Sequence, residues 1–213
     1  MGGLAEKLAG RFIVIDGPDG AGKSTQVRML ADSLGRQGLQ PICVRDPGGT
    51  RIGEKIRQIL LDAENGEMGV PCELMLYMAS RAQLVSEVIA PALRGGRCVL
   101  GDRYVSSTVA YQCAGGLEVR HVQAVAEVAV AGVWPDLTII LDLPPEEGLA
   151  RIKATPDRME SKDLDFHRQV RKFFSLQARE NPQKMTIIDG TDSIAEVQEK
   201  ILEALAGWRF SSK

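Results

Sequence analysis

The segment that most restricts the fold is residues 12–26, FIVIDGPDGAGKSTQ, in which an apolar run of strand length leads directly into a glycine-rich turn. From Gly17 to Ser24 the spacing is G-x-x-x-x-G-K-[ST], the pattern in which backbone N–H groups surround phosphate oxygens at the start of a helix. A buried strand before the turn and a helix after it give the motif the context that it requires. The segment therefore predicts an α/β protein with a phosphate-binding loop.

Each type of residue in this loop has an expected role. The glycines permit the turn, Lys23 reaches the terminal phosphates of a nucleotide, and the Ser24 hydroxyl ligates Mg²⁺. The residues expected around the phosphates are Gly17, Asp19, Gly20, Ala21, Gly22, Lys23, Ser24 and Thr25. The loop alone does not distinguish a GTPase, a motor ATPase and a kinase. Because the chain has no Asn-Lys-x-Asp element and, at 213 residues, is short for a motor, the pattern favours a transferase with a small acceptor.

Short apolar runs alternate with longer helical patterns along the whole chain, which is typical of a parallel sheet with helices on both faces. Strands are expected at Arg11–Asp16, Gln40–Arg45, Cys98–Asp102, Leu137–Leu143 and Met185–Asp189. Helices are expected at Gly22–Arg36, Ile52–Asp62, Cys72–Leu93, Tyr104–Cys113, Glu118–Ala131, Pro145–Ala154, Asp163–Asn181 and Ser193–Trp208. The sequence thus predicts a three-layer α/β P-loop fold with a five-stranded parallel sheet, in one domain over residues 1–213.

Composition restricts the partners. The 26 Lys and Arg residues nearly balance the 28 Asp and Glu residues, so no broad positive field is available for nucleic acid or an acidic membrane. No stretch approaches the ~20 apolar residues of a membrane span, and the N-terminus lacks a signal-peptide core. The four cysteines occur singly and are expected to be reduced and mostly buried: Cys43, Cys72, Cys98 and Cys113. We expect a cytoplasmic protein that binds neither nucleic acid nor membrane.

Two further segments follow expected strands and should lie at the same sheet edge as the loop. Asp102 is placed to hold Mg²⁺ or its water shell, and Arg103 offers a planar fork for a phosphate. The segment Arg45–Thr50, RDPGGT, is placed to form a wall of an acceptor pocket.

Tyr77 and Arg81 lie four residues apart on one face of an expected helix. Such a pair can stack on a base and donate to its carbonyl edge. A tyrosine at the edge of the core and an arginine on the surface are the simpler interpretation of these two residues alone.

Several segments taken in order make the chain resemble a thymidylate kinase, the P-loop enzyme that passes the γ-phosphoryl group of ATP to dTMP in dTTP biosynthesis. The segments are FIVIDGPDGAGKST, RDPGGTRIGEKIRQILL, LYMASRAQLV, GDRYVSSTVAYQ, PDLTIILDL and DRME. The resemblance extends from Phe12 to beyond Asp189 and implies ATP and dTMP as substrates, Mg²⁺ as cofactor and a homodimer. It implies that dTMP is bound by Asp19, Arg57, Tyr77, Arg81, Arg103, Thr108, Tyr111 and Gln112.

The resemblance also implies individual roles on the base side of the acceptor. Tyr77 stands where these enzymes have a base-stacking aromatic residue, and Arg81 matches the arginine that donates to thymine O4. Thr108 and Gln112 are expected near the edge of the base.

On the sugar and phosphate side, the resemblance implies that Asp19 accepts from the 3′-hydroxyl and that Tyr111 packs against the deoxyribose. Arg103 is expected to bind the dTMP phosphate, and Arg57 to reach the acceptor side. The adenine of ATP is expected between the helix after the P-loop and the turn Asp189–Asp192.

Thymidylate kinases carry a catalytic arginine either in the P-loop or in a mobile lid, and here the P-loop position is Gly20. The chain therefore resembles the bacterial type, with its arginine in a short lid at about residues 151–162. The expected catalytic residues are Lys23, Arg103, Arg151 and Arg158, whose positive charges align and neutralise phosphates. Transfer between phosphates needs no catalytic histidine, and His121 and His167 are expected at the surface.

Two rival functions remain at this stage. One is a P-loop kinase for a deoxynucleoside or another nucleoside monophosphate, although Arg103 favours a phosphorylated acceptor and the Tyr77 and Arg81 pair favours thymine. The other is a regulatory nucleotide-binding module that hydrolyses slowly and acts by changing shape.

Overall fold

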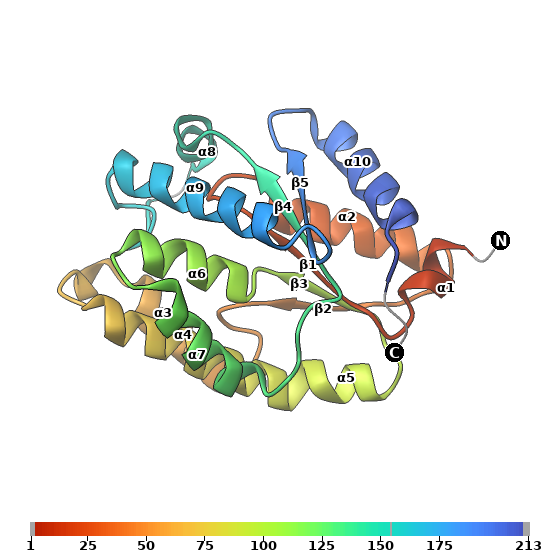
Figure 1. Cartoon of the computed structure of the whole chain (residues 1–213), viewed down its shortest axis with the longest axis horizontal. Helices are drawn as coiled ribbons and strands as arrows, with labels where there is room; N and C mark the ends of the chain where they lie inside the picture. Colours follow the sequence, from red (N-terminus) through yellow and green to blue (C-terminus); the bar gives the residue numbers. More distant parts are fainter. Residues whose placement is uncertain (1–2, 154, 211–213) are drawn as a thin grey trace.

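A computed structural model describes residues 3–153 and 155–210, and its centre is a five-stranded parallel sheet in the order β2-β3-β1-β4-β5 (Figure 1). The strands are β1 (Phe12–Asp16), β2 (Ile42–Arg45), β3 (Val99–Asp102), β4 (Leu137–Asp142) and β5 (Met185–Asp189). All five expected strands are confirmed; most of their ends coincide with the expected ends, and the others differ by one or two residues. The expected α/β class and sheet are therefore correct.

Helices surround this sheet and include every one that the sequence predicts. They are α1 (Leu4–Leu8), α2 (Lys23–Gly35), α3 (Arg51–Leu61), η1 (Ala63–Asn65), α4 (Val70–Leu84), the π-helix η2 (Val85–Ile89), α5 (Ala90–Arg94), α6 (Val105–Ala114), α7 (Val119–Val130), α8 (Pro145–Arg151), α9 (Leu164–Glu180) and α10 (Ile194–Gly207). Across residues 3–153 and 155–210, none of these helices combines the length and apolar character needed to cross a bilayer.

Three differences from the expected helices have local causes. The helix expected at Cys72–Leu93 contains the π-helical turn η2, which periodicity does not signal. Helix α8 ends at Arg151 because Ile152 adopts an extended backbone, and Ala154, the expected end, lies outside the described residues. Helix α1 and the single turn η1 are too short to produce a recognisable apolar period.

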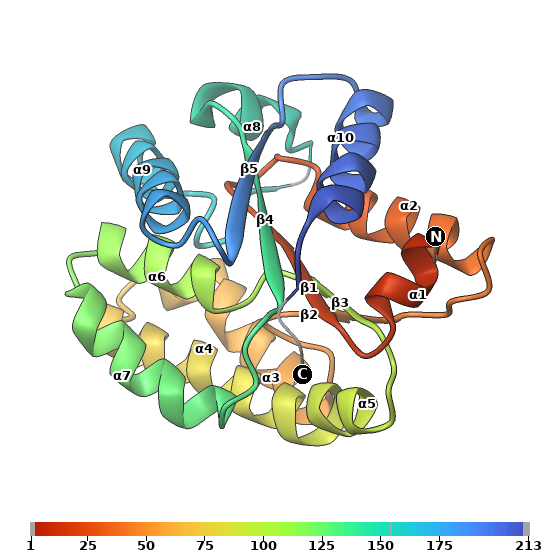
Figure 2. The ribbon, with the colours of Figure 1, turned by 45° about the vertical axis from the view of Figure 1, so that its right-hand side comes forward.

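The sheet has apolar contacts on both faces, which explains why β1 is a continuous apolar run. Ile13 and Ile15 belong to a cluster with α2 and α10, whereas Phe12 and Val14 belong to a cluster with α4, α6 and α7. Figure 2 shows α2 and α10 on the opposite side of the strands from α4, α6 and α7. Successive side chains of a strand point to opposite faces, so the central strands β1 and β3 contribute to both clusters.

The carboxyl ends of the strands bring the predicted site segments together. Strand β1 lies between β3 and β4, so the chain connections diverge beside it and leave a crevice at this edge. In the register, Asp102 is the partner of both Ile15 and Arg45, the residues near the ends of β1 and β2. The loops after β1, β2 and β3 therefore open at one place.

Two expectations about single side chains are wrong. Cys43 and Cys72 are exposed, although all four cysteines are free as expected. Cys43 lies on β2, the edge strand of the sheet, and Cys72 lies in the first turn of α4. His167 is buried because it shares the inner face of α9 with Val170 and Phe174.

Candidate functional site

The P-loop depends on close packing that only glycine permits at two positions. Gly17 has φ 137° and Gly20 has φ 74°, which are backbone conformations that other residues rarely adopt. A Cβ atom on Gly17 would lie 2.3 Å from the carbonyl oxygen of Leu141, and one on Gly20 would lie 2.0 Å from that of Gly148. An arginine at position 20 would therefore displace α8, which agrees with its absence from the loop.

Lys23 is the buried cation of the loop. Its ammonium group donates to the carbonyl oxygen of Pro18 at 2.6 Å. Burial, followed by the positive charge of Arg103, lowers the pKa of Lys23 to about 8. Because burial and Arg103 disfavour the protonated form of Lys23, an anion beside the ammonium group would stabilise it. The phosphates of a nucleotide would supply such an anion.

Ser24 and Asp102 meet where α2 begins and β3 ends, and the Ser24 hydroxyl donates to the Asp102 carboxylate. Both are hard oxygen donors of the kind that Mg²⁺ prefers. Among the described residues, no group of three or more His, Cys, Asp or Glu side chains is placed to hold a metal. The pair therefore fits a Mg²⁺ ion that takes its remaining ligands from phosphates and water.

A first cavity, of about 260 Å³, opens between the P-loop and helices α3, α4 and α6. Every residue expected around the acceptor lines it: Asp19, Arg57, Tyr77, Arg81, Arg103, Thr108, Tyr111 and Gln112. Lys23, Ser24 and Asp102 line it as well. The segment expected to form an acceptor wall contributes Arg45, Asp46 and Pro47, and the expected lid contributes Asp157, Met159 and Glu160. Leu61 and Ser107, which the sequence did not single out, complete the lining.

Arg103 lies at the mouth of the P-loop, held by backbone and side-chain contacts. Its φ of 69° is unusual for a residue with a side chain, and such strain costs about 1–3 kcal/mol. The guanidinium donates to the carbonyl oxygen of Gly17 at 2.9 Å and to Ser107 Oγ at 2.8 Å, and it pairs closely with Asp19. Arg103 is therefore positioned before any ligand arrives.

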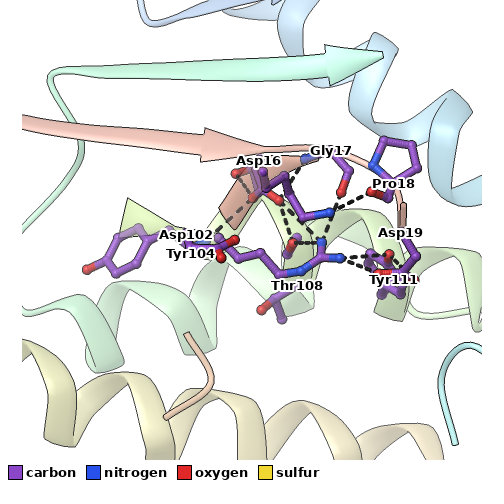
Figure 3. A network of polar contacts seen from close by, with 12 residues as sticks. Asp16, Gly17, Pro18, Asp19, Asp102, Tyr104, Thr108 and Tyr111 are labelled. Carbon is purple, nitrogen blue, oxygen red and sulfur yellow. Dashed lines mark hydrogen bonds and ion pairs between the residues drawn. The ribbon is translucent and has the colours of Figure 1, made fainter. Parts of the chain in front are cut away.

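Asp16 is a central residue of this network that the sequence analysis missed (Figure 3). The carboxylate is buried and accepts from Ser106 and Ser107, each at 2.6 Å, and from the backbone N–H of Gly17 at 2.9 Å. It also pairs with Arg103 at 3.5 Å. The available signal was a carboxylate ending an otherwise apolar central strand.

Asp19 and Tyr111 form a second polar pair in the first cavity, also drawn in Figure 3. The Tyr111 hydroxyl donates to Asp19 Oδ2 at 2.6 Å. Burial alone would raise the pKa of Asp19, but Arg103, Lys23 and the Tyr111 hydroxyl together lower it below its ordinary value. Asp19 is thus an ionised acceptor suited to a ligand hydroxyl.

Arg81 is only 1% exposed, so the interpretation as a surface arginine is wrong. Its Nε donates to Asp46 at 2.5 Å, and its Nη2 donates to Thr108 Oγ1 at 2.8 Å and to the carbonyl oxygen of Tyr104 at 3.2 Å. Among the described residues its Nη1 contacts the Met78 sulfur, a weak acceptor. Nη1 therefore retains the capacity to donate to a ligand.

Three other lining residues differ in how they are held. Burial raises the pKa of Tyr77, so the ring remains neutral. Arg57 donates to the carbonyl oxygen of Pro47 at 3.0 Å. Gln112 donates from Nε2 to Glu73 at 2.7 Å, and its buried Oε1 has no hydrogen-bond partner in the described structure.

A second cavity, also of about 260 Å³, lies on the other side of the P-loop. Its lining includes Gly20, Ala21, Gly22 and Thr25 of the loop and α2, Gly190 and Asp192 of the turn after β5, and Arg151 at the end of α8. Arg151 Nη1 donates to the carbonyl oxygen of Gly190 at 3.2 Å. The cavity occupies the place where the adenine was expected.

The two arginines of the expected lid are separated. Arg151 lines the second cavity, whereas Arg158 is 5% exposed and pairs with Glu73 on α4 at 2.5 Å. Arg158 Nε also donates to the carbonyl oxygen of Leu60 at 2.8 Å. In the described structure Arg158 lines neither cavity, although its neighbours Asp157 and Met159 line the first.

A phosphate loop at a sheet switch point that lines two cavities and carries the buried cation Lys23 defines a P-loop phosphotransferase. Comparison with known proteins supports this class of protein. The profile of the thymidylate kinase family matches residues 15–201.

Individual bacterial thymidylate kinases match almost from end to end. The thymidylate kinase of Caldanaerobacter subterraneus subsp. tengcongensis is 41% identical over 208 residues, which cover 97% of this chain and 100% of the relative. The thymidylate kinase of Thermoanaerobacter sp. (strain X514) is 42% identical over 200 residues, which cover 93% of this chain and 98% of the relative. That of Synechococcus sp. (strain JA-2-3B'a(2-13)) is 44% identical over 192 residues, covering 89% and 91%.

The chain therefore belongs to the thymidylate kinase family. Membership of this family makes it a kinase that transfers a phosphoryl group from ATP to dTMP.

The pKa of Lys23 leads to a prediction for nucleotide binding. Bound phosphates raise this pKa above about 8, so binding takes up a proton and ADP affinity falls as pH rises past that value. Between about pH 7 and about pH 9 the Kd for ADP should increase by about 10-fold. Calorimetric titration in two buffers of different ionisation enthalpy measures both the Kd and the proton uptake.

The matched control is Lys23→Arg, whose guanidinium stays protonated throughout this range. This variant should bind ADP with little dependence on pH, whatever its affinity. An equal pH dependence in both proteins would show that another group takes up the proton.

Proposed function

We propose that ATP binds with its adenine in the second cavity and its phosphates along the P-loop, and that dTMP binds in the first cavity. The observation that carries this proposal is that the loop contributes to both linings. Gly20, Ala21 and Gly22 line the second cavity, and Lys23 and Ser24 line the first. A triphosphate that follows the loop therefore ends beside the acceptor, as direct transfer requires.

The reaction joins an oxygen of the dTMP phosphate to the γ-phosphorus and breaks the bond from that phosphorus to the β,γ-bridging oxygen, giving dTDP and ADP. The acceptor oxygen is already ionised near neutral pH, so the protein has no proton to remove. Lys23 and the loop N–H groups neutralise the donor phosphates, and Arg103 fixes the acceptor phosphate. Both charges act in a buried site, where water does not weaken them.

Mg²⁺, held through Ser24 and Asp102, would offset negative charge on the donor phosphates. The hydrogen bond between these two side chains supports this assignment, because it places the two oxygens side by side.

The base and the sugar meet different walls of the first cavity. On the base side, the neutral ring of Tyr77 offers a stacking surface and Arg81 Nη1 offers a donor for thymine O4. Asp46 holds Arg81 in place. On the sugar side, Asp19 accepts from the 3′-hydroxyl and Tyr111 packs against the deoxyribose.

The rival functions fit these contacts less well. A deoxynucleoside would leave Arg103 without an anionic ligand, and a regulatory module would have no use for the first cavity, which Tyr77 and Arg81 line. Both rivals are tested in one assay.

ADP release from ATP and Mg²⁺ should be stimulated most by dTMP in a panel with dUMP, UMP, CMP, GMP and thymidine. Lys23→Ala and Arg103→Ala should each lower kcat/KM for dTMP by at least ~100-fold, because each removes a charged contact in the transition state. Stimulation by thymidine but not by dTMP would support the nucleoside kinase. If no acceptor stimulates ADP release, the regulatory module would be supported instead.

Of the two lid arginines, Arg151 has the geometry for a catalytic role, because it lines the second cavity, where we propose that ATP binds. Arg151→Ala should lower kcat by roughly 10- to 100-fold with little change in the KM for dTMP. Arg158→Ala should act mainly on the KM for dTMP, because Arg158 holds a wall of the acceptor cavity. Steady-state kinetics of both variants measure this, and the opposite pattern would assign the catalytic role to Arg158.

We also propose a homodimer, supported by apolar side chains exposed on two helices that pack together. Ile52 and Ile59 on α3 and Met75 on α4 are exposed, and Met75 is 55% exposed. A second copy of this chain would cover these side chains. A cytoplasmic location and the absence of nucleic-acid and membrane partners stay predictions.

Light scattering after size exclusion should give twice the mass of the chain, and Met75→Glu should reduce it to one chain by burying a charge in the interface. The matched control is Val128→Glu on α7, where Val128 is 81% exposed. If Val128→Glu separates the copies and Met75→Glu does not, the interface lies on α7 instead.

A further inference from the structure

Glu73, in the first turn of α4, carries a buried charge that no expected role explains. It is 4% exposed and contacts two groups of different kinds. Its Oε1 accepts from Gln112 Nε2 at 2.7 Å, and its Oε2 pairs with Arg158 Nη2 at 2.5 Å. One carboxylate therefore joins a side chain of the acceptor cavity to the segment that follows α8.

We propose that Glu73 is a positioning residue that orients the Gln112 carboxamide, so that the acceptor cavity selects bases carrying an N3–H group. Arg158 is its counter-charge. This inference rests on the proposed function, because it concerns the base that occupies the first cavity.

The orientation follows from the chemistry of the two side chains. An ionised carboxylate only accepts hydrogen bonds, whereas a carboxamide has a donating end and an accepting end. Glu73 therefore attracts the NH₂ end of Gln112 and repels its carbonyl oxygen. Gln112 lines the first cavity, and its buried Oε1 is without a hydrogen-bond partner in the described structure. A buried carbonyl oxygen in this state favours a ligand that supplies a donor.

The bases differ in what they offer to such an oxygen. Thymine and uracil carry a hydrogen on N3, whereas N3 of cytosine is an acceptor and would face the Gln112 oxygen with no proton between them. Arg81 adds a second selection, because its donor suits a carbonyl oxygen at position 4 and not an amino group. Glu73 thus acts on one of two contacts, and its loss should weaken selection without abolishing it.

Arg158 stabilises the buried carboxylate of Glu73. A buried carboxylate without an opposite charge is strongly unfavourable, and Arg158 supplies that charge from outside the cavity. The Arg158 backbone N–H donates to the carbonyl oxygen of Leu61 at 3.2 Å, and its Nε donates to that of Leu60 at 2.8 Å. These contacts bind the segment containing Asp157 and Met159, which line the cavity, to the end of α3.

A purely structural role for Glu73 is the alternative, since an acidic residue also stabilises the first turn of a helix. The two roles differ in one measurable respect. A structural role affects all acceptors equally, whereas an orienting role depends on the hydrogen at N3.

The test is calorimetric binding of dUMP and dCMP, which both lack the 5-methyl group and differ at positions 3 and 4. In Glu73→Gln the carboxamide at position 73 can donate or accept, so Gln112 can reverse. The ratio of Kd for dCMP to Kd for dUMP should fall by about 10-fold or more relative to the wild type. An unchanged ratio, with both ligands weakened by the same factor, would overturn the proposal.

Glu73→Asp is the conservative rescue, because it keeps an acceptor-only charge while packing less well. Glu73→Asp should retain more of the preference for dUMP over dCMP than Glu73→Gln does. A structural role predicts instead that Glu73→Asp retains no more of this preference than Glu73→Gln. Glu87→Gln is the matched control: Glu87 lies in the helical segment that continues α4, is exposed and accepts from Gln83. It should leave the ratio unchanged.

If the wild-type chain releases no ADP in response to dTMP, the proposed function fails. If it does so and Glu73→Gln leaves the ratio of the two Kd values unchanged, only the role of Glu73 fails.

Discussion

The contact on which the site depends is the one between the Arg103 guanidinium, at the end of β3, and the carboxylates of Asp16 and Asp19, at the end of β1 and in the P-loop. It joins two loops that neighbouring strands place side by side but do not themselves connect. In the proposed function the P-loop holds the donor and Arg103 faces the acceptor, so this ion-pair network would set the separation between the two substrates. The positive φ of Arg103 is the strained conformation that this placement requires.

Around this network, the first cavity is built from buried charges that compensate one another. Arg81 pairs with Asp46, and Arg158 pairs with Glu73, each at 2.5 Å. Buried pairs of this kind add little net stability, but they hold polar groups in one orientation. That property suits a pocket that must tell similar bases apart, since specificity depends on donors and acceptors that cannot rearrange.

Most of the fold and much of the site could be predicted from the sequence. The predictions that failed share one physical cause. The strands and the P-loop are marked by apolar runs and a short motif, and the residues expected around the acceptor, which the family resemblance implies, line the first cavity. Asp16 and Glu73 were missed, His167 was expected at the surface, and a surface position was the simpler interpretation of Arg81 before the family resemblance was considered. Each of these side chains is buried among elements distant in sequence, and periodicity within one element does not show what packs against it.

The sequence by itself determined the order of strands and helices, the phosphate loop and the types of charge available near it, because these depend on spacing along one segment. Only the tertiary structure decided which charge meets which. It placed Arg151 in the lining of the second cavity and Arg158 against Glu73, although both arginines belong to the same short segment. The reason is physical: a long cationic side chain takes its partner from whichever carboxylate or carbonyl the packing of other elements brings within reach.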